Sequence, residues 1–399
     1  MTSHEQTAPT HLGMIAADSL RFAVIALIAF LTLVDLFAAQ AILPSLVQKF
    51  GVSRATMGFA VNASTFGMAI AGIAVALFGR NINRRNGIWV SLVLLSIPTV
   101  LLSTTSDITT FAMLRVAQGL FMSAAFTLTV AYLAEHFSPA QSAGALAAYV
   151  TGNVASNFFG RILSAAVADN FGISVNFLTF AALNIAGALL VWLTLKKTER
   201  MMTGGGAQAT AGPALKYHLM DGELRRGFAI GFLILFVFIG TFTYVTFELA
   251  APPLALSPMA LGLVYFVFLP SMLTTPLAGR VAGRLGAGRG IGLTLGLAAA
   301  GLLALLAPNL PAVLAGMATV AVGTFLAQAI ATGHVGRAAK HDKAAASGIY
   351  LASYYTGGLV GSFVIGQVYD RLGWTASVAV MVLALVAAIA LARRLSPNG

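Results

Sequence analysis

Residues 20–44 read LRFAVIALIAFLTLVDLFAAQAILP, and this stretch decides the fold. Only Arg21 and Asp35 are charged within it. A helix needs about 20 mostly apolar residues to cross a hydrocarbon core of about 30 Å, so the stretch predicts a membrane-spanning helix. It is too long for the apolar core of a signal peptide, and no small-residue cleavage site follows it, so we expect a retained span.

Apolar segments of this size recur along the whole chain. The sequence is 58% hydrophobic and 9% charged, a composition that a soluble chain of 399 residues does not have. The alternating pattern of outer-membrane strands is absent. We therefore predict an all-α integral membrane protein with twelve transmembrane helices in two six-helix bundles related by a pseudo-two-fold axis. The expected spans are 20–44, 57–79, 88–105, 109–133, 143–167, 173–195, 227–249, 259–279, 289–307, 309–332, 345–368 and 374–392.

One basic loop divides the spans six and six. The first bundle is expected within residues 1–195 and the second within 227–399. The loop between them, residues 196–226, contains Gly204-Gly205-Gly206 and is predicted to be a flexible tether.

The distribution of basic residues predicts the orientation. The formal net charge is +11, but Lys and Arg occur one to three at a time in alternate loops, 18 on one side and 3 on the other. This is the positive-inside pattern, so both termini and the central loop are expected in the cytoplasm. We predict a multi-pass, monomeric protein of the cytoplasmic (inner) membrane, whose partner is the lipid bilayer and not nucleic acid.

The two halves of the sequence resemble each other. The fifth span contains AYVTGN at residues 148–153, and the eleventh contains SYYTGG at residues 353–358. Internal repeats of this size are typical of secondary transporters, in which the binding site lies between the repeats. The glycines of the eleventh span predict a tight contact between helices.

The joints after the second and eighth spans, GRNINRR (79–85) and GRVAGRLG (279–286), resemble the glycine–acid–basic loop of the major facilitator superfamily. Arg80 stands where that family has Asp, and Gly283 replaces the acid in the second joint. Leu114 to Gly119 is similar to the family's Arg-x-x-x-Gly motif. The resemblance implies a transporter that works by alternating access, without enzymatic activity or cofactor. The candidate gating residues that it implies are Arg80, Arg84, Arg85, Gly279, Arg284 and Gly286.

Three longer stretches are similar to the YnfM-like branch of this family, which is grouped with twelve-span drug:proton antiporters. They are residues 40–53, 149–161 and 334–355. The resemblance implies proton-coupled transport of small organic molecules.

Four charged residues lie inside the expected spans: Asp35, Arg115, Arg161 and Glu248. A charge in the bilayer is costly, so such residues usually pair or line a wet cavity. At about 1.5 Å per residue, Asp35 lies ~22 Å above the cytoplasmic start of its span. Arg115 lies ~9 Å below the outer start of its own, at the same level. An Asp35–Arg115 pair across the cavity is therefore predicted as the proton-coupling site, and a permanent structural ion pair is the alternative.

Other polar residues predict the substrate site. Asn153, Asn157 and Arg161 are four residues apart and share one helix face, which is expected to face inward together with Gln118. Arg161 and Glu248 lie near the outer ends of their spans, where they could reach water or form an outer gate. The second half contributes Thr241, Tyr244, Gln328, Tyr354 and Tyr355, which suit an amphiphilic or aromatic substrate. Packing between helices is the alternative for the neutral residues.

Several functions are disfavoured. The chain has no Cys, and all six His fall in tails or joints, so no metal site is expected. No phosphate-binding Gly-x-x-x-x-Gly-Lys motif supports an ATP-driven pump. The sequence thus favours a proton-coupled exporter of small organic molecules. The main alternative is a proton symporter or an organic-anion uptake carrier in which Arg115 and Arg161 clamp a carboxylate. A receptor that does not transport, or a membrane enzyme, is a more distant alternative.

Overall fold

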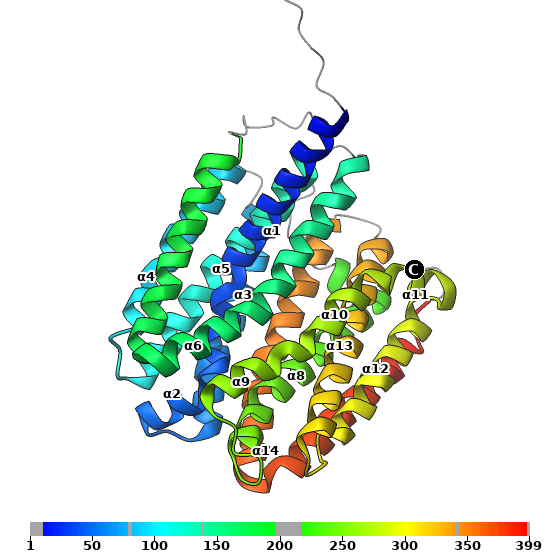
Figure 1. Cartoon of the computed structure of the whole chain (residues 1–399). Coiled ribbons are helices and arrows are strands. Elements are labelled where there is room, and N and C mark those ends of the chain that lie inside the picture. Colours follow the sequence, from blue (N-terminus) through cyan, green and yellow to red (C-terminus); the bar gives the residue numbers. More distant parts are fainter. Residues whose placement is uncertain (1–10, 79–81, 137–138, 197–216, 340–342, 397–399) are drawn as a thin grey trace, which may run out of the picture.

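The computed structural model describes residues 11–78, 82–136, 139–196, 217–339 and 343–396, and these residues are helical apart from short connections (Figure 1). The first half contains α1 (His11–Ala41), α2 (Leu43–Phe50), α3 (Arg54–Phe78), α4 (Arg84–Leu102), α5 (Ile108–His136) and α6 (Pro139–Thr194). The second half contains α8 (Gly222–Ala250), α9 (Pro258–Val264), η2 (Tyr265–Phe268), α10 (Leu269–Thr274), η3 (Thr275–Leu277), α11 (Ala278–Leu285), α12 (Ala287–Ala304), α13 (Leu310–Ala338) and α14 (Lys343–Ala392).

Ten helical segments within the described residues are long and apolar enough to cross a membrane, and two of them are twice the required length. Thr151–Thr194 has 44 residues and Ala345–Ala392 has 48, about 66–72 Å of helix at 1.5 Å per residue. Each changes direction at one glycine with positive φ, Gly172 (φ 87°) in α6 and Gly373 (φ 80°) in α14. Glycine adopts this conformation without the steric penalty of a Cβ. Each long element is thus a helical hairpin, and the predicted twelve crossings are confirmed.

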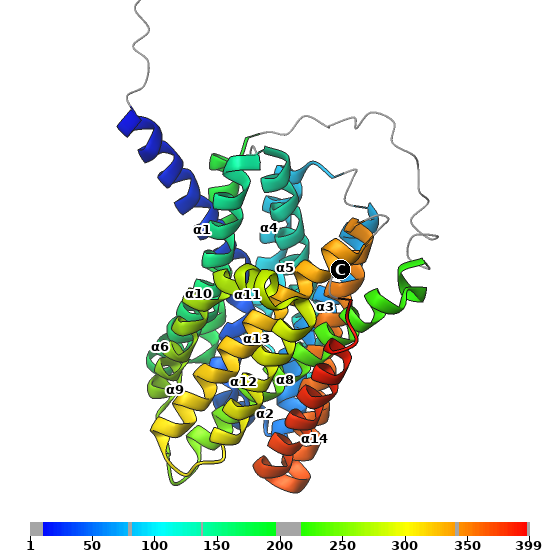
Figure 2. The same ribbon diagram turned by 90° about the vertical axis from the view of Figure 1, so that its right-hand side faces the viewer.

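The crossings form two bundles. In the first, α1 packs on α6 and α3 packs on α5, while α4 contacts both α5 and α6. In the second, α8 packs on α14 and α12 packs on α13 (Figure 2). The described ends of the chain lie at one side of the molecule (Figure 1). The opposite side, where Gly172 and Gly373 lie, is called the far side below.

The repeat that the sequence shows is also a repeat in packing. A Cβ on Gly152 would collide with the main-chain oxygen of Ala26, and a Cβ on Gly357 would collide with that of Phe232. Gly152 and Gly357 are equivalent in the AYVTGN and SYYTGG sequences. The fifth span therefore approaches the first as closely as the eleventh approaches the seventh, and the predicted tight contact of the eleventh span is confirmed. Small residues allow such close approach in membranes, where dispersion forces hold helices together.

Two spans differ from expectation, and proline accounts for both. The first span ends at Ala41 instead of Pro44, because a separate helix, α2, starts at Leu43 with proline in its first turn. The eighth span is five short pieces from α9 to α11, with Pro270 and Pro276 in the first turns of α10 and η3. Proline lacks the N–H that a continuous helix would use, so it fits best in the first turn of a helix.

The two bundles meet along α3 and α14, and where α6 packs on α9 and η2. Contacts at the far side close this interface. The backbone N–H of Ala55 donates to Asp370 Oδ2 at 3.1 Å. The Arg54 guanidinium lies 5.6 Å from the ring centroids of both Phe247 and Tyr369. The first turn of α3 is thereby held against α8 and α14.

Candidate functional site

Two groups of buried polar side chains lie in the first bundle. We call Asp35, Thr99, Arg115, Gln118 and Asn184 the Asp35 ring, and we call Gln40, Asn62, Asn157 and Arg161 the Arg161 group. Every member of both groups is at most 3% exposed. Hydrocarbon offers no hydrogen bonds to such side chains, so their partners come from the protein, a bound water, a substrate or a proton.

Arg115 is held by acceptors on three elements, and each of its five N–H bonds has one. Nε donates to Val61 O at 2.8 Å, Nη1 to Asp35 O at 3.2 Å and Gln118 Oε1 at 2.6 Å, and Nη2 to Leu36 O at 3.2 Å and Ser64 Oγ at 3.1 Å. Of the ion pairs within the described residues, none brings an Arg115 nitrogen within 4.0 Å of an Asp35 carboxylate oxygen. The residues meet as predicted, but the direct ion pair is not formed, because main-chain carbonyls of α1 and α3 occupy the guanidinium.

The Asp35 ring closes through two residues that the sequence analysis did not single out. Gln118 Nε2 and Asn184 Nδ2 both donate to Thr99 Oγ1, at 2.7 and 3.3 Å. The side chain of Asn184 is in turn a neighbour of the Asp35 carboxyl. Two acceptors remain without a partner among the described residues, Asp35 Oδ2 and Asn184 Oδ1. Inspection of neutral polar residues inside the third and sixth spans would have found Thr99 and Asn184.

The Arg161 group connects the two bundles. Arg161 Nη2 donates to Gln40 Oε1 at 2.6 Å, and Nε donates to Asn157 Oδ1 at 3.0 Å. Gln40 Nε2 donates to Asn62 Oδ1 at 2.6 Å, and Asn62 Nδ2 donates to Thr243 Oγ1 of α8 at 3.1 Å. Arg161 is therefore buried where the bundles meet and does not reach water. Asn153, one turn below Asn157, is partly exposed.

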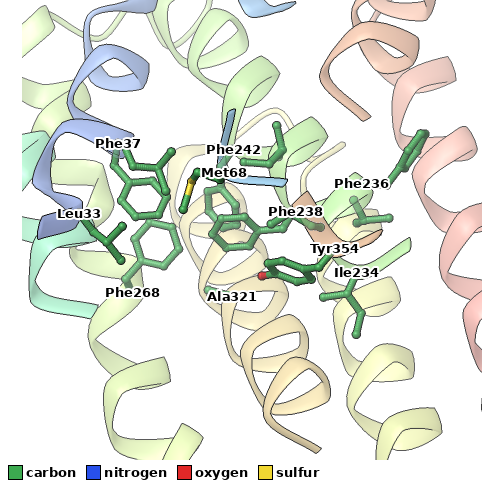
Figure 3. Packing of buried hydrophobic residues seen from close by; sticks show 14 of the residues in the cluster. Leu33, Phe37, Met68, Ile234, Phe236, Phe238, Phe242, Phe268, Ala321 and Tyr354 are labelled. Atoms are coloured by element: carbon green, nitrogen blue, oxygen red, sulfur yellow. The ribbon is translucent and has the colours of Figure 1, made fainter. Parts of the chain in front are cut away.

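Aromatic rings from both bundles surround the Arg161 guanidinium. Its Cζ lies 3.9 Å from the ring centroid of Tyr265, 5.1 Å from that of Phe37 and 5.5 Å from that of Phe268. Figure 3 shows Phe37 and Phe268 facing each other, with Met68 beside Phe242. The first bundle thus contributes the polar groups, and the second contributes most of the aromatic surface.

Four other predicted substrate residues lie at three separate positions in the second bundle. Tyr354 packs against Tyr355 at 5.5 Å between ring centroids, and its ring points into the interior near Phe238 (Figure 3). Gln328 on α13 is partly buried. Thr241 Oγ1 contacts Met381 Sδ at 3.3 Å, inside the second bundle and away from the interface.

Tyr244 and Glu248 belong to the far-side contacts and not to the Arg161 group. The Tyr244 hydroxyl donates to Ser362 O at 2.7 Å and lies against Gly58 of α3. Glu248 Oε1 accepts from the Tyr369 hydroxyl at 2.6 Å. An outer-gate role for Glu248 stays a prediction. Arg54 and Asp370 complete these contacts, but the sequence did not single them out. Arg54 follows a loop and Asp370 precedes a turn, and charged residues are common at such positions.

The candidate gating loops show contacts within single bundles. Arg80 lies outside the described residues. Arg84 contacts Ile82 O, and Arg85 donates to Trp192 O of α6 in the same bundle. In the second joint, Gly279 has open space at its Cβ position, Arg284 is exposed, and Gly286 (φ 77°) separates α11 from α12. A role for these residues in gating stays a prediction.

Comparison with known proteins adds the family. A family model described as Major Facilitator Superfamily matches residues 25–268 and 248–398. The inner membrane transport protein YnfM of Escherichia coli is 29% identical over 360 residues, which cover 90% of this chain and 86% of that protein. The uncharacterized MFS-type transporter YybF of Bacillus subtilis is 24% identical over 360 residues, which cover 90% and 89%.

Solved structures share the fold. A bacterial homologue of the human lysosomal transporter Spinster, in an inward-facing and occupied conformation, superimposes with a TM-score of 0.75 at 16% identity, covering 96% of this chain and 97% of that one. The nucleoside transporter NupG gives a TM-score of 0.72 at 13% identity, covering 94% and 98%. The observed helices, the family model and the transporter relatives agree, and the chain belongs to the major facilitator superfamily, a family of membrane transporters and not of enzymes.

Proposed function

We propose that this protein is a proton-coupled secondary transporter that exports small organic molecules across the cytoplasmic membrane by alternating access. Membership of the superfamily supports transport of a small molecule, and the relative YnfM is an inner membrane protein by name. The bias of Lys and Arg toward one set of loops supports cytoplasmic termini. In this orientation the far side faces outward.

One observation carries the proposal of proton coupling: Asp35 Oδ2 and Asn184 Oδ1 are both buried acceptors without a donor among the described residues. The two side chains are neighbours. A buried polar atom without a hydrogen bond costs about 1–3 kcal/mol, and an unpaired carboxylate costs more. One proton on Asp35 neutralises the carboxyl. The resulting O–H group can donate a hydrogen bond to Asn184 Oδ1. These two unpartnered acceptors support the proposal that Asp35 is protonated when the far side is closed.

The same helices link this proton to the bundle interface. Asp35 and Gln40 lie on α1, five residues or about 7.5 Å apart along the axis. Arg115 holds the carbonyl of Val61 on α3, directly before Asn62. Loss of the proton creates a carboxylate that competes with main-chain carbonyls for Arg115. Any shift of α1 or α3 that follows is passed through Gln40 and Asn62 to Arg161 and Thr243, which join the bundles.

Alternating access then requires these interface contacts to break and reform. Opening of the far side separates Asp370 from Ala55 and Asn62 from Thr243, and it moves Tyr265 away from Arg161. None of these contacts is covalent, and neutral hydrogen bonds contribute about 0.5–1.5 kcal/mol each. The free-energy difference between the closed and open forms is then small enough that binding of a proton or a substrate can shift the equilibrium between them.

The test uses proteoliposomes and two membrane-impermeant probes, benzenesulfonate and trimethylbenzylammonium. We expect a pH gradient to drive one probe into the acidic compartment, as antiport requires, and Asp35→Asn to abolish the effect of the gradient while exchange of probe across the membrane persists. Asp169→Asn, which changes an exposed acid three residues before the turn of α6 at Gly172, is the matched control. Full gradient-driven transport by Asp35→Asn would contradict the proposal. Accumulation in the alkaline compartment would indicate symport instead of export.

A further inference from the structure

We propose that Arg161 is the anion-binding group of the substrate site, and that the substrate is a small organic acid whose carboxylate binds the guanidinium while its apolar body lies on the aromatic rings around it. The inference rests on the proposed function in one respect, that the interface between the bundles is the transport site.

The contrast between the two buried arginines is the first observation. All five N–H bonds of Arg115 have acceptors, as described above, so that side chain has no capacity for a ligand. Arg161 is equally buried, but only Nε and Nη2 donate, and Nη1 has no hydrogen-bond partner among the described residues. A guanidinium has two hydrogens on each terminal nitrogen. Nη1 therefore retains two N–H bonds and Nη2 retains one, and these can donate to a carboxylate.

Charge balance is the second observation. Within the described part of the chain no ion pair involves Arg161, and its polar neighbours Gln40, Asn157 and Tyr265 are neutral. The rings of Phe37, Tyr265 and Phe268 attract a cation but do not neutralise it. A guanidinium taken out of water without a counter-ion is unfavourable. An organic anion that enters the interface supplies the missing charge.

The surroundings of Arg161 define the rest of the ligand. Tyr265 and Phe268 lie on η2 of the second bundle, and Phe37 lies on α1 of the first. A ligand body placed between them contacts both bundles and buries apolar surface against aromatic rings. In the present conformation Arg161 is completely buried, with these rings lying on its guanidinium. Relative movement of the bundles uncovers the guanidinium, so binding of the anion is linked to the conformational change.

Asn157 offers a sharp test because it is nearly isosteric with Asp. Its Oδ1 already accepts from Arg161 Nε at 3.0 Å. Asn157→Asp therefore places a permanent carboxylate on the guanidinium without new volume. This internal counter-ion competes with the anionic ligand, and an ion pair formed in place of a neutral contact favours folding of the variant.

The experiment measures thermal unfolding of the purified protein with benzoate, benzamide or benzylammonium, at equal ionic strength. Benzoate is expected to stabilise the wild type more than the other two probes. Arg161→Gln and Asn157→Asp should each lower the affinity for benzoate at least ~10-fold, the loss expected for a charge-assisted hydrogen bond. Arg161→Lys should bind benzoate more weakly and still prefer it to benzamide. Arg371→Gln, an exposed arginine at the far side, should leave benzoate binding unchanged.

Two results would overturn the inference: a wild type that binds benzoate no better than benzamide, or an Asn157→Asp variant with wild-type affinity for benzoate. The test with Asn157→Asp remains valid even if the Arg161→Gln variant does not fold. The outcome is separable from the proposed function. If benzoate binds through Arg161 but no proton-driven transport occurs, the inference holds and the proposed proton coupling is wrong. If trimethylbenzylammonium is transported by the proton gradient and the protein shows no preference for carboxylates, the proposed function holds and the inference is wrong.

Discussion

Asp370→Ala is expected to weaken the closure of the far side. Asp370 Oδ2 accepts from the backbone N–H of Ala55 at 3.1 Å, in the first turn of the 25-residue helix α3. A side chain that accepts from a helix N-terminal N–H contributes about 0.5–2 kcal/mol, and its negative charge is favourable there. The variant should therefore lose about 1 kcal/mol of closure free energy. The population of the open form then increases about fivefold.

Thiol labelling measures this population, because the chain has no cysteine of its own. Ala55→Cys places one thiol at a position that is 2% exposed and packed against Gly366 of the second bundle. Its rate of reaction with a maleimide, in purified protein, reports transient opening. The rate should increase about fivefold when Asp370→Ala is added. Asp169→Ala, an exposed acid on the first bundle only, should leave it unchanged. An unaltered rate in the Asp370→Ala variant would refute the assignment of these contacts to closure.

Two further substitutions test packing and the Asp35 ring. Gly152→Ala should lower the unfolding temperature, because the added Cβ collides with Ala26 O, whereas Gly296→Ala, which has open space at this position, should leave the temperature unchanged or raise it. An equal effect of both changes would contradict the close packing of the first and fifth spans. Asn184→Leu should reduce proton-driven probe transport more than it reduces probe exchange, because Asp35 loses the acceptor for its proton. Proteoliposome assays of both activities measure this difference. An equal loss of both activities would indicate a structural role for Asn184.

The spans could be predicted from sequence because hydrophobic length is a local property. The expected boundaries of 167 and 173 bracket Gly172, and those of 368 and 374 bracket Gly373, so both turns were located to within a few residues. The interruption of the eighth span was not predicted. Its prolines were visible in the sequence, but a proline within an apolar run is compatible with a kinked continuous helix as well as with the observed short pieces.

The site was only partly predictable. Asp35, Arg115 and Arg161 stand out in any sequence because a charge in the bilayer is costly. Which acceptor a guanidinium finds depends on the register between helices, and this register is tertiary information. Arg115 therefore binds the carbonyl of Asp35 and not its carboxylate. Gln40 was missed as a partner of Arg161 for a similar reason: a neutral amide inside a span is compatible with ordinary helix packing until its neighbours are known.

The hydrogen bond between Asn62 and Thr243 links two bundles that otherwise differ in the side chains they contribute. The first bundle carries the buried charges and the second carries most of the aromatic surface, but the hydrogen bond at 3.1 Å between these residues crosses the interface. The proposed proton site in the first bundle is thus connected with the position of the second bundle through a short series of side chains.

The protonation of Asp35 in the far-side-closed form is the central claim, and infrared spectroscopy of the purified protein measures it directly. The carbonyl stretch of a protonated carboxyl is separate from that of a carboxylate. The difference spectrum between wild type and Asp35→Asn at neutral pH should contain the band of one buried protonated carboxyl, and that between wild type and Asp169→Asn should not. A wild-type spectrum in which Asp35 contributes only carboxylate bands would contradict the account.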